Sequence, residues 1–258
     1  MRLISENDPD AIATLESRML EFYSTVKNYN AYIESTQATD LWNETIRIAT
    51  ESEIPQVRIC EIGAGKSGLG DYITKISPNL RKKIHLCCHD ITTVNKEHLE
   101  SVADEVIIGS VDSITGTWDI ILHSYVLEHV VRPEEFLRRI YHILTPGGIH
   151  LFQCPRYDVP FYLPPAFDHL SWLGRMGIQL RRLWFDNRLT VVNDPAVLHL
   201  PWKLDRDAVH LVSKRQIARI HPDAKIGTFR VKAYGKKDWL VKNLLTLRMI
   251  LRKPIKDS

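Results

Sequence analysis

Residues 61–68, Glu-Ile-Gly-Ala-Gly-Lys-Ser-Gly, combine residue types and a spacing that suit the binding of a small ligand. Glycines let the backbone approach a bound molecule closely, and the apolar run VRICEI at 57–62 predicts that the loop follows a buried strand. Glu61 adds a carboxylate at the end of that strand, two residues before the first glycine. The segment therefore predicts a binding loop beside a negative charge.

Two phosphate-binding loops share part of this pattern. Gly65-Lys66-Ser67 is similar to the end of a P-loop, but the first glycine of that motif would fall on Cys60. Residues 63–68 also spell the G-x-G-x-x-G of a dinucleotide site, and Asp90 lies where such a site has its ribose-binding acid. Glu61 would repel a pyrophosphate and attract an ammonium group. This charge favours S-adenosylmethionine, which carries an amino group and a sulfonium but no phosphate.

Five short apolar runs predict the strands that position this loop. They are separated by helix-length polar or amphipathic stretches, and they span residues 57–62, 84–89, 105–109, 118–124 and 149–154. This alternation is typical of βαβ units and of a mostly parallel sheet that is buried on both faces. Residues 133–144 predict a helix that ends at Thr145-Pro146-Gly147-Gly148. We expect an α/β fold with a Rossmann-like, doubly wound sheet.

A longer stretch carries a family resemblance. Residues 118–148 read WDIILHSYVLEHVVRPEEFLRRIYHILTPGG. They resemble the F-D-x-V-x-x-x-x-V-L-E-H-V…P…F-L…L-x-P-G-G segment of class I S-adenosylmethionine-dependent methyltransferases, and in particular those with a methyltransferase type 11/12-like domain. With the E-x-G-x-G loop and Asp90, the resemblance covers residues 57–155. It implies the class I methyltransferase fold, S-adenosyl-L-methionine as the cofactor, and methyl transfer by in-line displacement.

The resemblance also implies which residues bind the cofactor. The glycine loop would approach the methionine part of the cofactor, at Gly63, Ala64 and Gly65, and the third glycine of the family motif falls on Ser67. Glu61 would orient the amino group. Asp90 would bond both ribose hydroxyls, because a carboxylate offers two acceptor oxygens to two donors.

Two further segments complete the implied cofactor site. The adenine would lie near the end of the third strand, at Ser110, Val111 and Asp112. The methionine side would be lined by the end of the fourth strand, at His123 and Ser124.

The sequence offers several candidates for a general base. Histidine is the natural choice near neutral pH, and we name His123, His169 and His199. We expect His129, in the LEHV segment, to pack against a helix instead. The D…D-N arrangement of Mg²⁺-dependent methyltransferases does not occur in the sequence, so we predict no metal.

We divide the chain into four parts: a helical N-terminal extension (1–54), a cofactor-binding core (55–155), an insertion (156–208), and the end of the core with a basic C-terminal helix (209–258). The insertion is rich in proline and aromatic residues and suits either an acceptor-binding lid or a small core of its own; these aromatic residues are Phe161, Tyr162, Phe167, Trp172, Trp184 and Phe185. We expect O-methylation of a small-molecule or glycan acceptor.

The last twenty residues carry both bases and leucines. Leu240, Leu244, Leu247 and Leu251 fit one face of a helix, which would either pack on the sheet or bind an anionic membrane. Partial packing is our prediction.

Composition limits the remaining alternatives. A net charge of +3 does not favour nucleic acid, and no apolar run is long enough for a membrane span. The four cysteines fall in predicted strands, which indicates reduced thiols in a cytoplasmic protein, with the basic tail allowing a peripheral membrane contact. A cofactor-binding subunit without catalysis and an NAD-dependent oxidoreductase remain alternative functions. The oligomeric state is not predicted.

Overall fold

A seven-stranded sheet forms the centre of the computed structural model, which describes residues 8–25, 36–160, 162–168, 170–184, 207–229, 231 and 235–255. The strand order is β3-β2-β1-β4-β5-β7-β6. Its parallel part consists of β1 (Val57–Ile62), β2 (Ile84–Asp90), β3 (Glu105–Ile108), β4 (Trp118–Ser124) and β5 (Leu144–Pro155). β7 (Thr246–Arg252) is antiparallel to both of its neighbours, β5 and β6 (Lys225–Gly227). All five predicted strands and the α/β fold class are confirmed.

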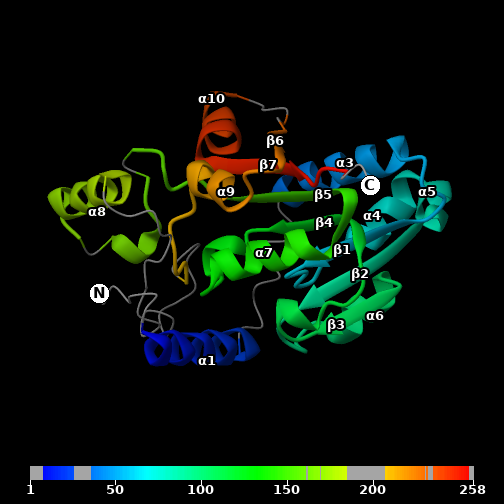
Figure 1. Cartoon of the computed structure of the whole chain (residues 1–258), viewed down its shortest axis with the longest axis horizontal. Coiled ribbons are helices and arrows are strands. Elements are labelled where there is room, and N and C mark those ends of the chain that lie inside the picture. Colours follow the sequence, from blue (N-terminus) through cyan, green and yellow to red (C-terminus); the bar gives the residue numbers. More distant parts are fainter. Residues whose placement is uncertain are drawn as a thin grey trace.

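Helices cover both faces of the sheet (Figure 1). One face packs on α3 (Thr36–Glu51), α4 (Leu69–Ile76), α5 (Pro78–Lys83) and α6 (Lys96–Val102). The other face packs on α7 (Pro133–Ile143) and α9 (Lys214–Ile220). Strand alternation explains this division, because Ile59 of β1 belongs to the first core and Cys60 to the second. The four cysteines are all buried and reduced.

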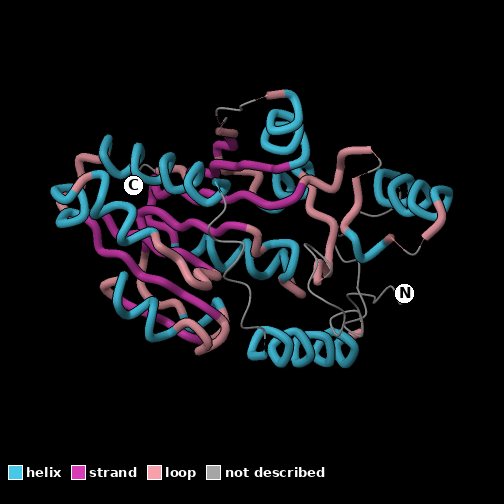
Figure 2. The backbone as a smooth tube through the Cα atoms, turned by 180° about the vertical axis from the view of Figure 1, so that it is seen from behind, coloured by secondary structure: helices cyan, strands magenta, loops and turns pink. Residues whose placement is uncertain are grey.

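In the described residues of the predicted N-terminal extension, the two helices have different partners. α3 packs on β4 and β5, whereas α1 (Pro9–Thr25) lies away from the sheet (Figures 1 and 2). Ile12, Leu15 and Met19 are buried on one side of α1, and they pack against Val131 and Val209. The spacing of three and four residues gives α1 one apolar face, which it uses to contact the segment that follows β4.

In the part of the insertion that the structure describes, aromatic residues form a small apolar cluster with Leu211, from the segment that follows the insertion. Tyr157 and Phe167 are buried together with Leu211, and Tyr162 packs against them. α8 (Trp172–Trp184) follows the short turn η3 (Pro165–Phe167), and its Trp172 is 60% exposed. Phe161 and Phe185 lie outside the described residues, as does the side chain of Trp184.

The C-terminal segment differs from the helix expected over 240–251. α10 (Lys236–Trp239) continues as a π-helix (Leu240–Leu245), but residues 246–252 form β7 inside the sheet. Leu247, Met249 and Leu251 alternate along this strand and are buried in the core. The helical leucine face therefore does not form, although the packing of its C-terminal half is confirmed. No helix in the described ranges is long and apolar enough to cross a membrane.

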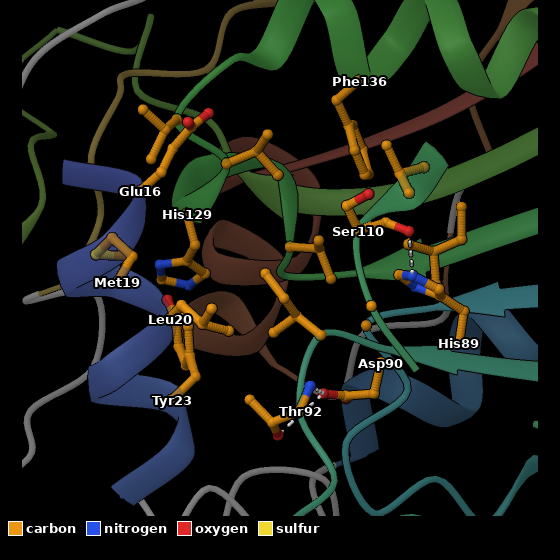
Figure 3. Close-up of a pocket in the computed structure, with 18 of the residues that line it drawn as sticks. Glu16, Met19, Leu20, Tyr23, His89, Asp90, Thr92, Ser110, His129 and Phe136 are labelled. Atoms are coloured by element: carbon orange, nitrogen blue, oxygen red, sulfur yellow. Dashed lines mark hydrogen bonds between the residues drawn. The ribbon is translucent and has the colours of Figure 1, made fainter. Parts of the chain in front are cut away.

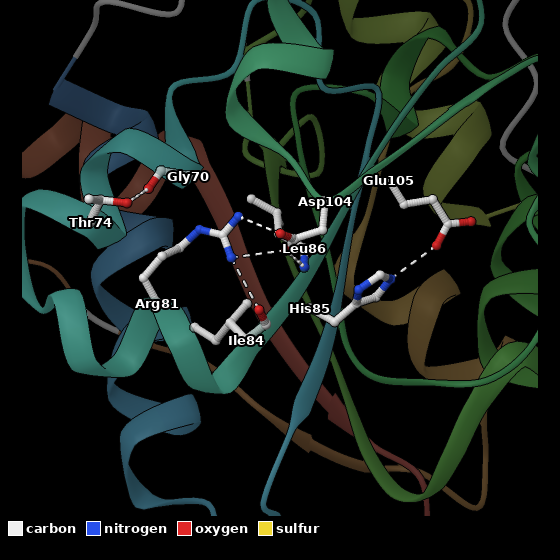
Figure 4. A network of polar contacts seen from close by, with 8 residues as sticks. All are labelled: Gly70, Thr74, Arg81, Ile84, His85, Leu86, Asp104 and Glu105. Atoms are coloured by element: carbon white, nitrogen blue, oxygen red, sulfur yellow. Dashed lines mark hydrogen bonds and ion pairs between the residues drawn. The ribbon is translucent and has the colours of Figure 1, made fainter.

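A polar network joins β2 to the start of β3 (Figure 4). Asp104 accepts two hydrogen bonds from Arg81, both 2.9 Å long, and one of 2.8 Å from the Leu86 N–H. Burial alone would raise the pKa of Asp104, but these hydrogen bonds outweigh it and lower the pKa. Next to this network, His85 Nε2 lies 3.1 Å from Glu105 Oε2.

Replacement of Leu251 by alanine tests whether β7 belongs to the sheet. Leu251 has no exposed surface, so the loss of its side chain is expected to lower the free energy of unfolding by about 2–5 kcal/mol. Ile255 is 71% exposed, and Ile255→Ala, the matched control, is expected to change stability by less than about 0.5 kcal/mol. Denaturant unfolding measures both, and equal effects would contradict the strand assignment.

Candidate active site

A cavity of about 730 Å³ opens at the carboxyl ends of the parallel strands. Its wall is formed by the residues where β1 to β4 end, including Gly63, Asp90, Ser110 and Tyr125. β1 lies between β2 and β4. From β1 the chain builds the sheet outward on one side through β2 and β3, and it then returns to build the other side from β4. Such a reversal separates the loops on either side and creates a crevice, which is where ligands bind in open α/β sheets.

The glycine loop after β1 has a backbone that favours glycine. Gly63 and Gly65 have φ values of 63° and 56°, in the left-handed region. A side chain at Gly63 would also place its Cβ 2.5 Å from Cγ2 of Val126. Only glycine therefore fits at this position, and without side chains the backbone of the loop is accessible from the cavity. A bound cofactor requires this close approach. Ala64, by contrast, is buried and does not line the cavity.

Asp90 joins the glycine loop to β2 and faces the cavity (Figure 3). Its Oδ2 accepts a 2.7 Å hydrogen bond from the Gly65 N–H, and its Oδ1 accepts one of 3.0 Å from the Thr92 N–H. Oδ1 also accepts a longer hydrogen bond, of 3.4 Å, from the Thr92 hydroxyl, which a ribose hydroxyl can replace. A carboxylate has about four acceptor sites, so two remain for the hydroxyls of a ribose beside the two N–H groups. Its position therefore fits the role that the sequence predicts.

Glu61 lies behind the loop and does not line the cavity. Its Oε2 accepts a 2.5 Å hydrogen bond from Ser67 Oγ, and its Oε1 accepts one of 3.3 Å from Trp42 of α3. Burial raises the pKa of Glu61 to about 7, although both hydrogen bonds work to lower it. Ser67 stands where the family motif has glycine, and its hydroxyl also accepts from the Leu69 N–H at 3.1 Å, at the start of α4. The serine thus connects Glu61 to a helix.

The predicted adenine segment also lies at the cavity. Ser110 precedes the 3₁₀ turn η1 (Val111–Ser113), and Ser110, Val111 and Asp112 all line the wall. The imidazole of His89 lies 3.2 Å from the Ser110 carbonyl and holds this turn against β2.

His123 requires a correction. Strand alternation points its side chain toward α7, where the ring stacks on Phe152 and contacts Phe136 edge to face. It has no exposed surface and does not line the cavity, and burial lowers its pKa to about 3. In this position His123 cannot contact cofactor or acceptor, so it is neither a base nor a cofactor ligand. Ser124 lies outside the cavity wall as well, where its Oγ accepts a 2.8 Å hydrogen bond from Gln153.

Tyr125, the residue after β4, lines the cavity with an unusual backbone. Its φ of 54° is in the left-handed region, which a non-glycine residue seldom adopts, and the Gln153 carbonyl accepts a 2.8 Å hydrogen bond from its N–H. Strain of this kind is often found at functional sites.

The far side of the cavity is formed by α1. Glu16, Met19, Leu20 and Tyr23 face the strand ends from this helix (Figure 3). Arg132 donates a 2.7 Å hydrogen bond to Glu16 at the rim. In the described part of the insertion, no residue lines the cavity.

His129 also lines the cavity, and sequence reasoning assigned it to helix packing instead. It ends the 3₁₀ turn η2 (Leu127–His129), and its Nδ1 lies 3.3 Å from Oδ2 of Asp207. Tyr23 and Asp207 were not recognised in the sequence, because nothing local marks residues so far apart as neighbours. The other two candidate bases, His169 and His199, lie outside the described residues.

A family model for the methyltransferase domain matches residues 20–221. The chain belongs to the methyltransferase domain family. The predicted class, an S-adenosylmethionine-dependent methyltransferase of class I, is thereby confirmed, and S-adenosylmethionine is its cofactor. No curated protein sequence matches the chain.

Solved structures support the fold of this methyltransferase. The plantazolicin methyltransferase BpumL, in complex with a pentazolic desmethylPZN analog and SAH, has a TM-score of 0.57 and 15% identity, over 95% of this chain and 99% of that one. The CurJ carbon methyltransferase has a TM-score of 0.55 and 15% identity, over 96% and 68%. YcgJ from Bacillus subtilis has a TM-score of 0.53 and 13% identity, over 84% and 99%.

Asp90→Asn is expected to weaken the binding of S-adenosylhomocysteine to the methyltransferase by about 1.5–3 kcal/mol, the value of a hydrogen bond to a charged group. Asp104→Asn is the matched control, because the Asp104 carboxylate also accepts a hydrogen bond from a backbone N–H but does not line the cavity. Both variants should unfold more easily, and only the first should lose affinity in isothermal titration. Equal affinity in the two variants would contradict the position assigned to the ribose.

Glu61→Gln is expected to change how stability depends on pH. The pKa of Glu61 is about 7 in the folded state, above its ordinary value of 4.5, so the wild type loses stability as pH rises through this interval. A glutamine has no charge to lose. From pH 5 to pH 8, the free energy of unfolding of the variant should therefore rise relative to that of the wild type, by on the order of 2–3 kcal/mol.

Thermal unfolding across this pH range measures the difference. Parallel curves for the two proteins would show that Glu61 is ionised in the folded state throughout.

Proposed function

We propose that this methyltransferase transfers the methyl group of S-adenosylmethionine to a hydroxyl of a small, largely apolar molecule. The observation that carries the proposal is the continuity of the cavity, which extends from Asp90 and Ser110 at the strand ends to Met19, Leu20 and Tyr23 of α1. Its volume of about 730 Å³ lies within the range of small-molecule sites. One half suits the cofactor, and the other leaves room for an acceptor beside it.

The lining on the α1 side favours an apolar acceptor over a glycan. Met19, Leu20, Val130 and Val131 contribute apolar side chains to the wall. A sugar presents hydroxyls on every side, and these would lose water without gaining enough partners here. A flat or branched apolar molecule with one reactive hydroxyl would instead gain from burial.

The chemistry that the chain must supply is modest. Bound S-adenosylmethionine provides an activated methyl group on its sulfonium, so the protein has to align the acceptor and exclude water. An oxygen nucleophile gains from a nearby base, and the imidazole of His129 lines the acceptor half of the cavity. This imidazole supports a hydroxyl as the group that is methylated.

A screen of the purified protein tests the function. Labelled S-adenosylmethionine is incubated with apolar alcohols and phenols, with amines of matched shape, and with free sugars, each in the presence and absence of EDTA. We expect transfer to hydroxyl compounds that survives EDTA. Transfer to amines alone, or loss of activity in EDTA with rescue by Mg²⁺, would contradict the proposal.

Leu20→Gln tests the acceptor half. Leu20 lines the cavity from α1 and is 44% exposed, so a polar amide there should raise the KM of the best acceptor from the screen and leave the Kd of S-adenosylhomocysteine unchanged. Ala13→Gln, on an exposed part of α1 outside the cavity wall, is the matched control and should change neither value. A Leu20 variant with weaker cofactor binding and unchanged KM would show that α1 covers the cofactor instead.

A further inference from the structure

His129 borders the cavity beside a buried carboxylate. Its side chain is 12% exposed, whereas His123 and His150 are enclosed in the core and His89, which also borders the cavity, lies next to the Ser110 carbonyl instead. The Nδ1 of His129 lies 3.3 Å from Oδ2 of Asp207, whose side chain is only 2% exposed. An imidazole thus has a buried carboxylate behind it and the acceptor half of the cavity beside it.

Asp207 is held in this position by two other parts of the chain. Tyr23 of α1 donates a 3.0 Å hydrogen bond to the same Oδ2, and its ring lies edge to face with that of His129 (Figure 3). The N–H groups of Val209 and His210 both donate to the Glu128 carbonyl, at 2.8 and 3.3 Å. Three segments that are distant in sequence therefore meet at this carboxylate.

The remaining charged groups around His129 are mostly acidic. Glu128, which is fully buried, has its Oε1 3.8 Å from Nε2 of the ring. Glu16 of α1 and Arg132 neutralise each other at the rim, and Glu135 of α7 also borders the cavity. Carboxylates near an imidazole favour its protonated form, and this strengthens it as a proton acceptor.

We propose that His129 is the catalytic base of the methyl transfer and that Asp207 is its positioning residue. In this proposal the neutral ring carries its proton on Nδ1, where the Asp207 carboxylate at 3.3 Å favours it, so that Nε2 is the unprotonated nitrogen. Nε2 then takes the proton of the acceptor hydroxyl. The oxygen–methyl bond forms as the sulfur–methyl bond breaks, and sulfur keeps the electron pair. The imidazolium beside Asp207 later returns its proton to water. This inference rests on the proposed methylation of a hydroxyl.

The rate of transfer as a function of pH tests the base. In the wild type, kcat should fall at acidic pH as the imidazole becomes protonated. His129→Asn should lower kcat by roughly 10²–10⁴-fold and abolish this acidic limb, while the Kd of S-adenosylhomocysteine stays the same. Asp207→Asn should lower kcat less and move the limb to lower pH, because loss of the carboxylate destabilises the imidazolium.

The chain offers a matched control pair. His85 and Glu105 also form a histidine–carboxylate contact, of 3.1 Å, but they lie outside the cavity wall. His85→Asn and Glu105→Gln should leave kcat and the pH profile unchanged. If His129→Asn behaves like His85→Asn, His129 only packs and the inference fails.

A second measurement needs no acceptor. In NMR spectra of the imidazole nitrogens, the His129 signal can be assigned among the 11 histidines by its loss in His129→Asn. In the complex with S-adenosylhomocysteine, this signal should titrate at lower pH in Asp207→Asn than in the wild type. Identical titrations would overturn the pairing even if hydroxyl methylation is found. Methyl transfer to an amine, with an acidic fall in kcat that persists in His129→Asn, would instead overturn the proposed function.

Discussion

Parallel strands in one layer must end at the same edge, and this constraint determines where the chemistry of the molecule can occur. Here β1, β2, β3 and β4 deliver Gly63, Asp90, Ser110 and Tyr125 to a single wall. The reversal of strand order at β1 opens the space between them. The wall of the cofactor half follows from this geometry, because each of these residues ends its strand or follows within two residues of its end.

Several polar groups behind this wall fix the loops rather than contact a ligand. Asp90 accepts from Gly65, and Ser67 connects Glu61 to the start of α4. Trp42 of α3 donates to Glu61 from the face of the sheet opposite α7. The acid of the glycine motif is thus part of the support of the loop. A residue's place in a motif indicates its position in the fold, but its partners determine its role.

Sequence reasoning works well where the pattern is local. The strand β1 and the glycine loop lie within one short segment, and Asp90 ends the next strand. Sequence reasoning fails where the same residues fit both the helical and the strand period. Leu240, Leu244, Leu247 and Leu251 have the spacing of one helix face. Leu247, Met249 and Leu251 also alternate as the residues of a strand do. Pairing with β5 decides between them, and no local pattern reveals that pairing. His123 was misplaced because the face of β4 that meets α7 is set by packing.

The two halves of the cavity are encoded differently along the chain. The cofactor half comes from the stretch between β1 and the residues after β4, whereas the proposed acceptor half combines residues 129–131 of that stretch with α1. Substitutions in α1 can therefore reshape the proposed acceptor half without touching the residues at the strand ends. Exchange of α1 between related proteins is a direct route to new acceptors on an unchanged cofactor scaffold.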